Sequence, residues 1–291
     1  MTLTNQKKEN KHKHTLKIVL VSVVVIILLV LVAGYFKLYK SPVTVAYLHL
    51  ERGDVTVNTG NGWQSAQQDM NLGLEDKVKT GANGKASIIL YESVFVSLEP
   101  NTEVSIADLN KEHLLIKQET GETWNKFTTM MGVNGMSVQT PTSIASVRGT
   151  SFGVTVNQVI VGEGSVEVTR GAEKIVLKQE EKVDLRAEKL ERTVVDETDR
   201  TRVVERMSES LNRMKESRSK ELAKNQYLID KMERKYGFSM ERELTNVDSG
   251  SKDLDVIEEN IPVQTESIKK IRLTTEEIIK EQTRINSLTK R

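Results

Sequence analysis

The feature that most limits how this chain can fold is a run of nineteen residues without a charged side chain, Ile18 to Phe36. Fourteen of the nineteen are valine, isoleucine or leucine. As a helix the run spans about 28 Å, close to the roughly 30 Å apolar thickness of a bilayer. β-Branched residues favour strands in water, but a lone strand in lipid would leave its backbone polar groups without hydrogen bonds. The run therefore predicts a transmembrane helix, within an anchor over residues 18–39.

The charges that flank this run predict its orientation. Five lysines lie between residues 7 and 17, whereas only Lys37 and Lys40 follow the run closely. Because the more positive flank stays in the cytoplasm, residues 1–17 should form a cytoplasmic basic tail and the bulk of the chain should be extracytoplasmic. A cleaved signal peptide would have a shorter apolar core and a small-residue cleavage site. We therefore expect an uncleaved single-pass anchor in the cell membrane, facing a periplasm or an open cell surface.

Residues 43–185 show a different pattern, in which apolar and polar residues alternate. Period-two alternation rich in β-branched residues is typical of strands with one buried face. The pairs Asn61-Gly62, Asn83-Gly84 and Asn134-Gly135 separate such runs and are typical of hairpin turns. The roughly ten-residue spacing of the runs fits a sandwich, a barrel or a β-roll. This region is predicted to be one mainly β domain, large enough for its own core.

Several segments of this region resemble the FecR domain family. Four segments carry the resemblance, in the family's order: Asp76–Leu90, Glu99–Val104, Thr140–Val154 and Gly162–Val168. The third contains the Thr-Pro and Val-Arg-Gly-Thr elements that are similar to the family's signature. The resemblance implies an extracytoplasmic β domain with β-roll or β-helix-like character that senses a partner protein. Family regulators carry a cytoplasmic sigma-binding domain before the membrane helix; here only seventeen polar residues precede it, so an anti-sigma role is not expected.

The segments of resemblance supply the candidate site residues, which are Arg148, Gly149, Thr150, Pro141, Gly81 and Gly84. Glycine allows close backbone approach or a positive φ, and arginine offers five hydrogen-bond donors. The favoured interpretation makes Arg148 a buried strut that joins strands. The alternative makes it a contact for an anion or a peptide.

Other functional classes find little support in the sequence. With 42 basic and 41 acidic residues the net charge is +1, which argues against a nucleic-acid binder. There is no cysteine, and His49 and His113 lack metal-ligand spacing. Trp63 and Trp124 are more typical of core or rim positions than of sugar-stacking sites. We therefore expect no enzyme activity, no cofactor and no metal site.

Residues beyond 185 change character again. Residues 186–245 are rich in charge and lack proline, which predicts a long charged helix. Met207, Leu211 and Met214 form a fragment of a coiled-coil seam. This helix could self-associate into a homo-oligomer, pack on the β domain or a partner, or remain solvated. Residues 246–266 are predicted to be a linker, and 267–291 an amphipathic helix with Ile268, Ile271, Ile278, Ile279, Gln282 and Ile285 on its apolar face.

Two hypotheses for function remain. The first is a membrane-anchored sensing or protein-interaction module whose partner is an envelope protein. The alternative is an envelope scaffold that assembles through its C-terminal helices and contacts the cell wall.

Overall fold

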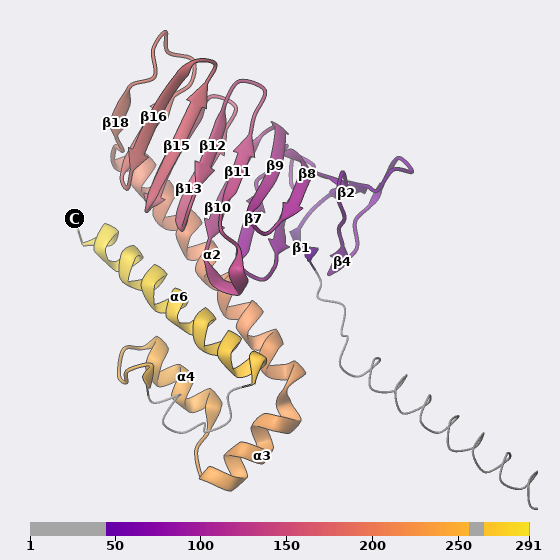
Figure 1. Ribbon diagram of the computed structural model, residues 1–291, viewed down its shortest axis with the longest axis vertical. Coiled ribbons are helices and arrows are strands. Elements are labelled where there is room, and N and C mark those ends of the chain that lie inside the picture. Colours follow the sequence, from indigo (N-terminus) through magenta and orange to yellow (C-terminus); the bar gives the residue numbers. More distant parts are fainter. Residues whose placement is uncertain (1–44, 256–264, 291) are drawn as a thin grey trace, which may run out of the picture. The chain divides into compact units, whose positions relative to one another are not determined.

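Two nine-stranded β-sheets form the middle of the chain in the computed structural model, which describes residues 45–255 and 265–290 (Figure 1). Helices follow the sheets in sequence, so the chain is mainly β with a C-terminal helical region, as the sequence predicts. The predicted basic tail and transmembrane anchor lie outside the described residues. Within the described ranges, no helix combines the length and apolar character needed to span a bilayer.

The two sheets are here called sheet A and sheet B. In spatial order, sheet A contains β18 (Arg192–Val194), β17 (Glu181–Asp184), β14 (Gln158–Glu163), β13 (Thr150–Thr155), β10 (Glu122–Phe127), β7 (Val94–Leu98), β6 (Lys85–Leu90), β1 (Ala46–Arg52) and β4 (Met70–Asn71). Sheet B contains β16 (Glu173–Lys178), β15 (Ser165–Arg170), β12 (Ile144–Val147), β11 (Met136–Gln139), β9 (His113–Thr120), β8 (Glu103–Asn110), β5 (Lys77–Thr80), β2 (Val55–Asn58) and β3 (Trp63–Ser65).

The chain passes back and forth between the sheets, adding one or two strands to one before crossing to the other. The order of strands in space therefore nearly follows their order in sequence. Neighbouring strands pair antiparallel, except β9 and β11, which are parallel. This progressive winding makes most pairings local in sequence.

The winding corrects two of the three predicted hairpins. Asn61-Gly62 joins the paired strands β2 and β3, as predicted. Asn83-Gly84 and Asn134-Gly135 instead lie where the chain crosses between sheets, and neither glycine has the positive φ of a type I′ turn. Glycine is needed at position 84 for space, because a Cβ there would lie 2.1 Å from the carbonyl oxygen of Asp54.

Alternate side chains of both sheets point inward and form one apolar core. Ile88 and Leu98 of sheet A meet this core from one side, and Ile106 and Ile116 of sheet B from the other; all four are fully buried. The remaining side chains of these strands point to the outer faces. The period-two pattern therefore reports the inner faces correctly.

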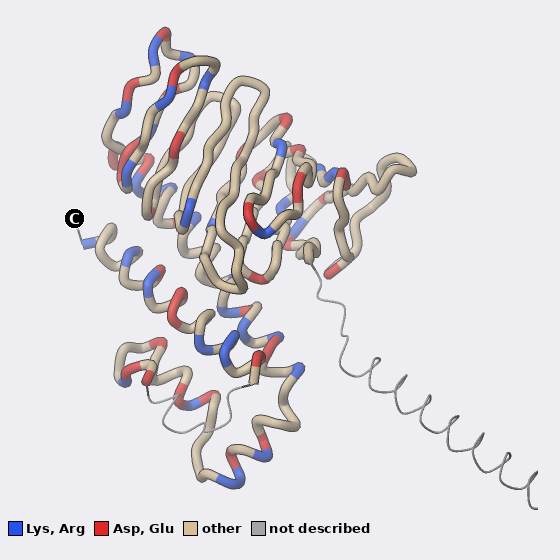
Figure 2. Tube along the Cα trace, viewed as in Figure 1, with Lys and Arg blue, Asp and Glu red and all other residues tan. Residues whose placement is uncertain are grey.

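Within the described residues the sheets are followed by the helices α2 (Glu197–Lys224), α3 (Gln226–Tyr236), α4 (Met240–Asp248) and α6 (Glu266–Thr289). The Asp196 side chain caps α2 by accepting a hydrogen bond from the backbone N–H of Asp199. In Figure 2 the charged positions gather along these helices and at the ends of the strands.

The single long helix predicted over residues 186–245 differs from the structure. Its first part holds strand β18, and the helical part is interrupted at Asn225 and again at Gly237, which has a left-handed φ of 72°. α4 continues to Asp248, inside the predicted linker, and residues 256–264 of that linker lie outside the described residues. Glycine and asparagine end helices readily, so charge density alone overestimated the length of the helix.

The apolar stripe of α2 covers the outer face of sheet A. Members of one cluster come from sheet A, α2 and α6: Ile89, Phe95, Trp124, Ile160, Val203, Met207, Leu211, Met214, Ile278, Ile285 and Leu288. The predicted seam residues therefore pack within their own chain, and no coiled-coil dimer is needed to bury them. A smaller cluster joins α3, α4 and the start of α6 through Met232, Leu244 and Ile271.

The close packing of Trp124 against Gly153 of β13 predicts a strong effect of a single methyl group. A Cβ on Gly153 would lie 2.9 Å from the indole ring of Trp124, whereas one on Gly73 would meet only Asp76 Oδ2, at 3.7 Å. We expect Gly153→Ala to lower the free energy of unfolding by about 1–3 kcal/mol, because the buried ring has no space to move. Thermal unfolding of the full chain in detergent measures this, with Gly73→Ala as the control. Equal melting temperatures for the two variants would contradict the packing described here.

Candidate functional site

The outer faces of the two sheets differ, and the covered face of sheet A is organised around Trp124. This side chain is 1% exposed, and its Nε1 donates to Ser151 Oγ at 3.2 Å. Glycines on the neighbouring strands leave room for the ring and for the helix: a Cβ on Gly162 would lie 3.0 Å from Met207 Sδ. The structure thus places Trp124 in a core, as predicted, while Trp63 is 44% exposed.

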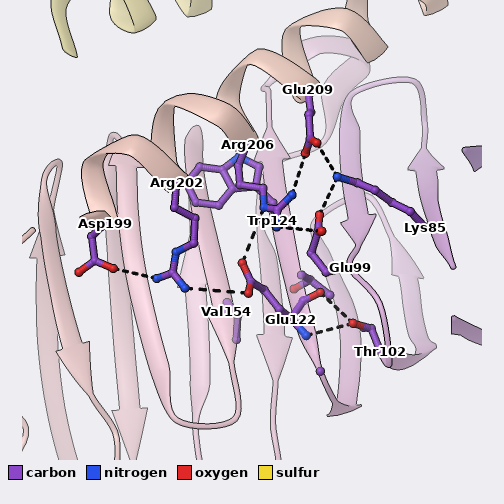
Figure 3. Close-up of polar contacts among 12 residues, drawn as sticks. Lys85, Glu99, Thr102, Glu122, Trp124, Val154, Asp199, Arg202, Arg206 and Glu209 are labelled. Atoms are coloured by element: carbon purple, nitrogen blue, oxygen red, sulfur yellow. Dashed lines mark hydrogen bonds and ion pairs between the residues drawn. The ribbon is translucent and has the colours of Figure 1, made fainter. Parts of the chain in front are cut away.

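Charged side chains also join α2 to sheet A, as Figure 3 shows. Arg206 lies 2.8 Å from Glu99 and 3.8 Å from Glu122. The ammonium of Lys85 lies 3.0 Å from Glu99 and 2.6 Å from Glu209 of the helix. Burial raises the pKa of Glu99, although Lys85 and Arg206 partly offset this effect.

One step further along α2, Arg202 continues this network (Figure 3). Its guanidinium donates to Gln158 at 2.7 Å, is 3.0 Å from Asp199 and lies 4.0 Å from Glu122. Three basic residues and four carboxylates thus meet between the sheet and the helix. The set is well suited to fix the helix in one register.

A second charged group attaches α6 to the same face. Lys126 of β10 is 1% exposed, and its Nζ lies 2.6 Å from Glu163 and 2.7 Å from Glu281. Glu281 is fully buried, and its other carboxylate oxygen accepts a hydrogen bond from Ser151 at 3.4 Å. This hydroxyl is the one that accepts from Trp124, so the two helices share one anchoring point on the sheet.

The charge balance of this group is unequal, since two carboxylates share one ammonium. Burial raises the pKa of Glu281 to about 7, despite the attraction of Lys126. Burial acts in the same direction on Glu163, but there the Lys126 ammonium outweighs it and holds the pKa below its usual range. Burial alone would lower the pKa of Lys126, but the two carboxylates outweigh this and raise it.

The outer face of sheet B is exposed instead. Ile144 is 38% exposed and Val176 is 45% exposed, although both lie within strands of a nine-stranded sheet. In Figure 1 the helices lie on the side of sheet A, away from this face. His113, Ser137 and Ser146 form a hydrogen-bonded group on it, with Ser137 Oγ 2.8 Å from His113 Nε2 and 2.7 Å from Ser146 Oγ.

The structure corrects the favoured interpretation of Arg148. Its side chain is exposed at the bend between β12 and β13, and it forms no hydrogen bond or ion pair with the described residues. Gly149 has a φ of 82°, and Thr150 is buried with its Oγ1 donating to the carbonyl oxygen of Ser165 at 3.1 Å. Gly149 and Thr150 therefore shape the crossover, while Arg148 projects from it.

The strut role belongs to Arg170 at the end of β15. Its Nη1 donates to the carbonyl oxygens of Leu185 and Ala187 at 2.7 and 2.6 Å. Its Nη2 donates to Glu173 at 2.6 Å and to the carbonyl oxygen of Glu188 at 3.0 Å. This arginine holds the loop that follows β17 against the end of β15. No motif distinguishes it in the sequence, because its partners come from an irregular loop.

The remaining candidate residues do not gather at Arg148. Gly81 lies four strands away along sheet B, next to Gly84, and its N–H donates to the carbonyl oxygen of Asp54 at 2.8 Å. The pair shapes the crossover from β5 to β6. Pro141 is exposed in the turn between β11 and β12, where the Thr140 N–H donates to the Ser143 carbonyl oxygen at 2.8 Å.

The different surroundings of Arg170 and Arg148 give a prediction about stability. Arg170→Ala removes the charged donor of three backbone carbonyl groups and should lower the free energy of unfolding by about 1–3 kcal/mol, because hydrogen bonds from a charged group are stronger than neutral ones. Arg148→Ala removes an exposed side chain and should change it by no more than about 0.5 kcal/mol. Thermal unfolding of the two full-length variants tests this directly. A larger loss for Arg148→Ala would restore the strut interpretation for that residue.

The raised pKa of Glu281 predicts a pH dependence. The folded chain holds this proton more tightly than the unfolded chain, so its stabilising effect is complete below pH 4.5 and is lost as the pH rises through about 7. Urea unfolding between pH 5 and 8 should show stability falling more steeply for the native chain than for Glu281→Gln. The amide cannot ionise, and Glu163 stays charged throughout this range. Parallel pH profiles would contradict the assignment.

Comparison with known proteins connects these features to a family. No curated protein matches the chain. Two solved structures, at 2.50 and 1.65 Å resolution, of a "putative anti-sigma factor" from Parabacteroides distasonis ATCC 8503 are similar to part of it. Each shares 20% identity at a TM-score of 0.37, over 41% of this chain and 60% of that one.

A protein-family model described as FecR protein matches residues 76–172. The match begins one residue before β5 and ends two residues after β15. It therefore includes Gly81, Gly84, Trp124 and the Arg148 crossover. The helices α2 to α6 lie beyond it. The chain therefore contains a FecR domain over residues 76–172.

Proposed function

We propose that this chain is a membrane-anchored, extracytoplasmic sensing or protein-interaction module without enzyme activity, and that sheet B is its recognition surface. The observation that carries the proposal is the difference between the two outer faces. Sheet A is covered by helices of the same chain, whereas sheet B leaves Ile144, Val176 and Arg148 exposed. Exposed apolar residues beside unpaired charge are typical of protein interfaces.

The apolar run over residues 18–36 supports the anchor, and the lysines before it support a cytoplasmic N-terminus. A sensing role agrees with the FecR match. An envelope protein is the expected partner. The scaffold alternative is weaker, because the apolar stripe of α2 is already buried within the chain and is not free for assembly.

The absence of cysteine from the chain makes its topology directly measurable. We expect a membrane-impermeant maleimide to label Ile144→Cys in intact spheroplasts, because this position is exposed and extracytoplasmic. Asn10→Cys should be labelled only after lysis. The reverse pattern, or equal labelling of both positions before lysis, would contradict the proposed orientation.

The same variants test recognition. A benzophenone maleimide attached at Ile144→Cys should cross-link a protein partner in native membranes, while the same group at Lys231→Cys on α3 should not. Both positions are exposed, so reactivity is matched. The full chain is required, since truncation after Leu185 would uncover Trp124 and its apolar neighbours. Adducts from α3 alone would transfer the recognition role to the helices.

A further inference from the structure

Sheet B carries three basic side chains in one row across its strands. The register pairs Leu114 with Met136, Met136 with Val147, and Val147 with Val166, and it also pairs Ser165 with Lys178. Shifting the first three pairs by one residue toward the strand ends places His113 beside Gly135, Gly135 beside Arg148, and Arg148 beside Ser165. With the Ser165–Lys178 pair, these residues form one row across the sheet: His113, Gly135, Arg148, Ser165 and Lys178. We call His113, Arg148 and Lys178 the basic row.

Small residues separate the members of the basic row. Gly135 lies between His113 and Arg148, and Ser165 lies between Arg148 and Lys178. The imidazole of His113 lies over Gly135, since a Cβ there would be 3.3 Å from Nδ1. Each basic residue is two strands from the next, a spacing of about 10 Å. The row thus places the permanent charges of Arg148 and Lys178 two strands apart on one face.

The two permanent charges of the row are without partners. Neither the Arg148 guanidinium nor the Lys178 ammonium forms an ion pair with any described residue, and both side chains are exposed. The Glu181 carboxylate accepts from the backbone N–H of Lys178 at 2.8 Å rather than from its ammonium. By contrast, Lys174 on the same strand is paired with Glu167 at 2.8 Å.

Apolar side chains accompany the basic row on the same face. Val176 is two residues from Lys178 on β16, so both side chains project to the same side, and Val176 is 45% exposed. Ile144 lies on β12, the strand that leads to Arg148, and is 38% exposed. A sugar-phosphate polymer would gain little from these side chains, whereas a peptide with both acidic and apolar residues would contact both features.

We propose that the basic row binds an acidic, extended segment of a partner protein, with its carboxylates on Arg148 and Lys178 and its apolar residues against Val176 and Ile144. This inference rests on the proposed function, because it specifies what sheet B recognises. The crossover that carries Arg148 packs closely against the turn at Gly164. A Cβ on Gly164 would lie 2.6 Å from the carbonyl oxygen of Gly149.

The test uses the full chain in detergent and a fluorescein-labelled octapeptide of alternating glutamate and valine. Fluorescence anisotropy should show binding of this peptide, and none of a lysine–valine octapeptide at the same concentrations. Arg148→Ala and Lys178→Ala should each weaken binding about threefold, and together about tenfold, as expected for exposed charge pairs. Lack of binding to the acidic peptide, or an unchanged affinity in the double variant, would overturn the proposal.

Two controls separate specific from general charge effects. Arg192→Ala and Lys231→Ala remove exposed cations from sheet A and α3, and should leave the affinity unchanged. Inorganic polyphosphate is the competitor, and it should displace the peptide only at a higher concentration of negative charge. Displacement at a lower concentration, or equal losses in the control variants, would show that any polyanion suffices.

The cross-linking experiment at Ile144→Cys distinguishes this inference from the proposed function. If Arg148→Ala/Lys178→Ala abolishes the protein adduct in native membranes, both stand. If the adduct persists unchanged, sheet B remains the recognition surface and the acidic-segment proposal is wrong. If no adduct forms in either chain, the proposed function itself fails.

Discussion

The contact between Trp124 and α2 is the one on which the arrangement of the helices depends. Without it, the outer face of sheet A would expose Trp124, Phe95, Ile89 and Ile160 together. An apolar patch of this kind is rarely left in water by a soluble domain. Gly153 and Gly162 make the contact close, since any side chain at either position would meet the ring or the helix. The C-terminal helices are therefore part of the folded β domain.

Apolar contact alone does not determine where each helix lies along the sheet. Buried ion pairs contribute little net stability, because removal of both charges from water costs about as much as their attraction returns. Breaking only one member is costly, however, since it leaves a buried charge alone. A shift of α6 by one turn would separate Glu281 from Lys126, and a shift of α2 would separate Arg206 from Glu99. The charged groups thus select one register among several that apolar packing would allow.

The sequence predicts the strands well, because alternation is a local property that each strand carries in its own residues. It also contains a sign of the helical cover: in β7 the outward Phe95 stands between the inward Val94 and Val96. The predicted apolar face of α6 included Gln282, but the charged side chain that the helix fully buries is that of the neighbouring Glu281. Its partner Lys126 lies 155 residues away, so no local pattern could identify the pair. Arg148 was misjudged for a related reason, because a motif shows that a residue recurs but not whether its side chain points inward or outward.

The two outer faces are separate surfaces, but they are joined by a short stretch of chain. Arg148 projects from the open face, and only Gly149 and Thr150 lie between it and Ser151 of β13. The Ser151 hydroxyl accepts from Trp124 and donates to Glu281, so it touches both the apolar and the charged parts of the covered face. Thr150 holds the crossover through its hydrogen bond to Ser165, and Gly164 packs closely against the carbonyl oxygen of Gly149. This two-residue connection means that the position of Arg148 and the position of the helices depend on the same backbone.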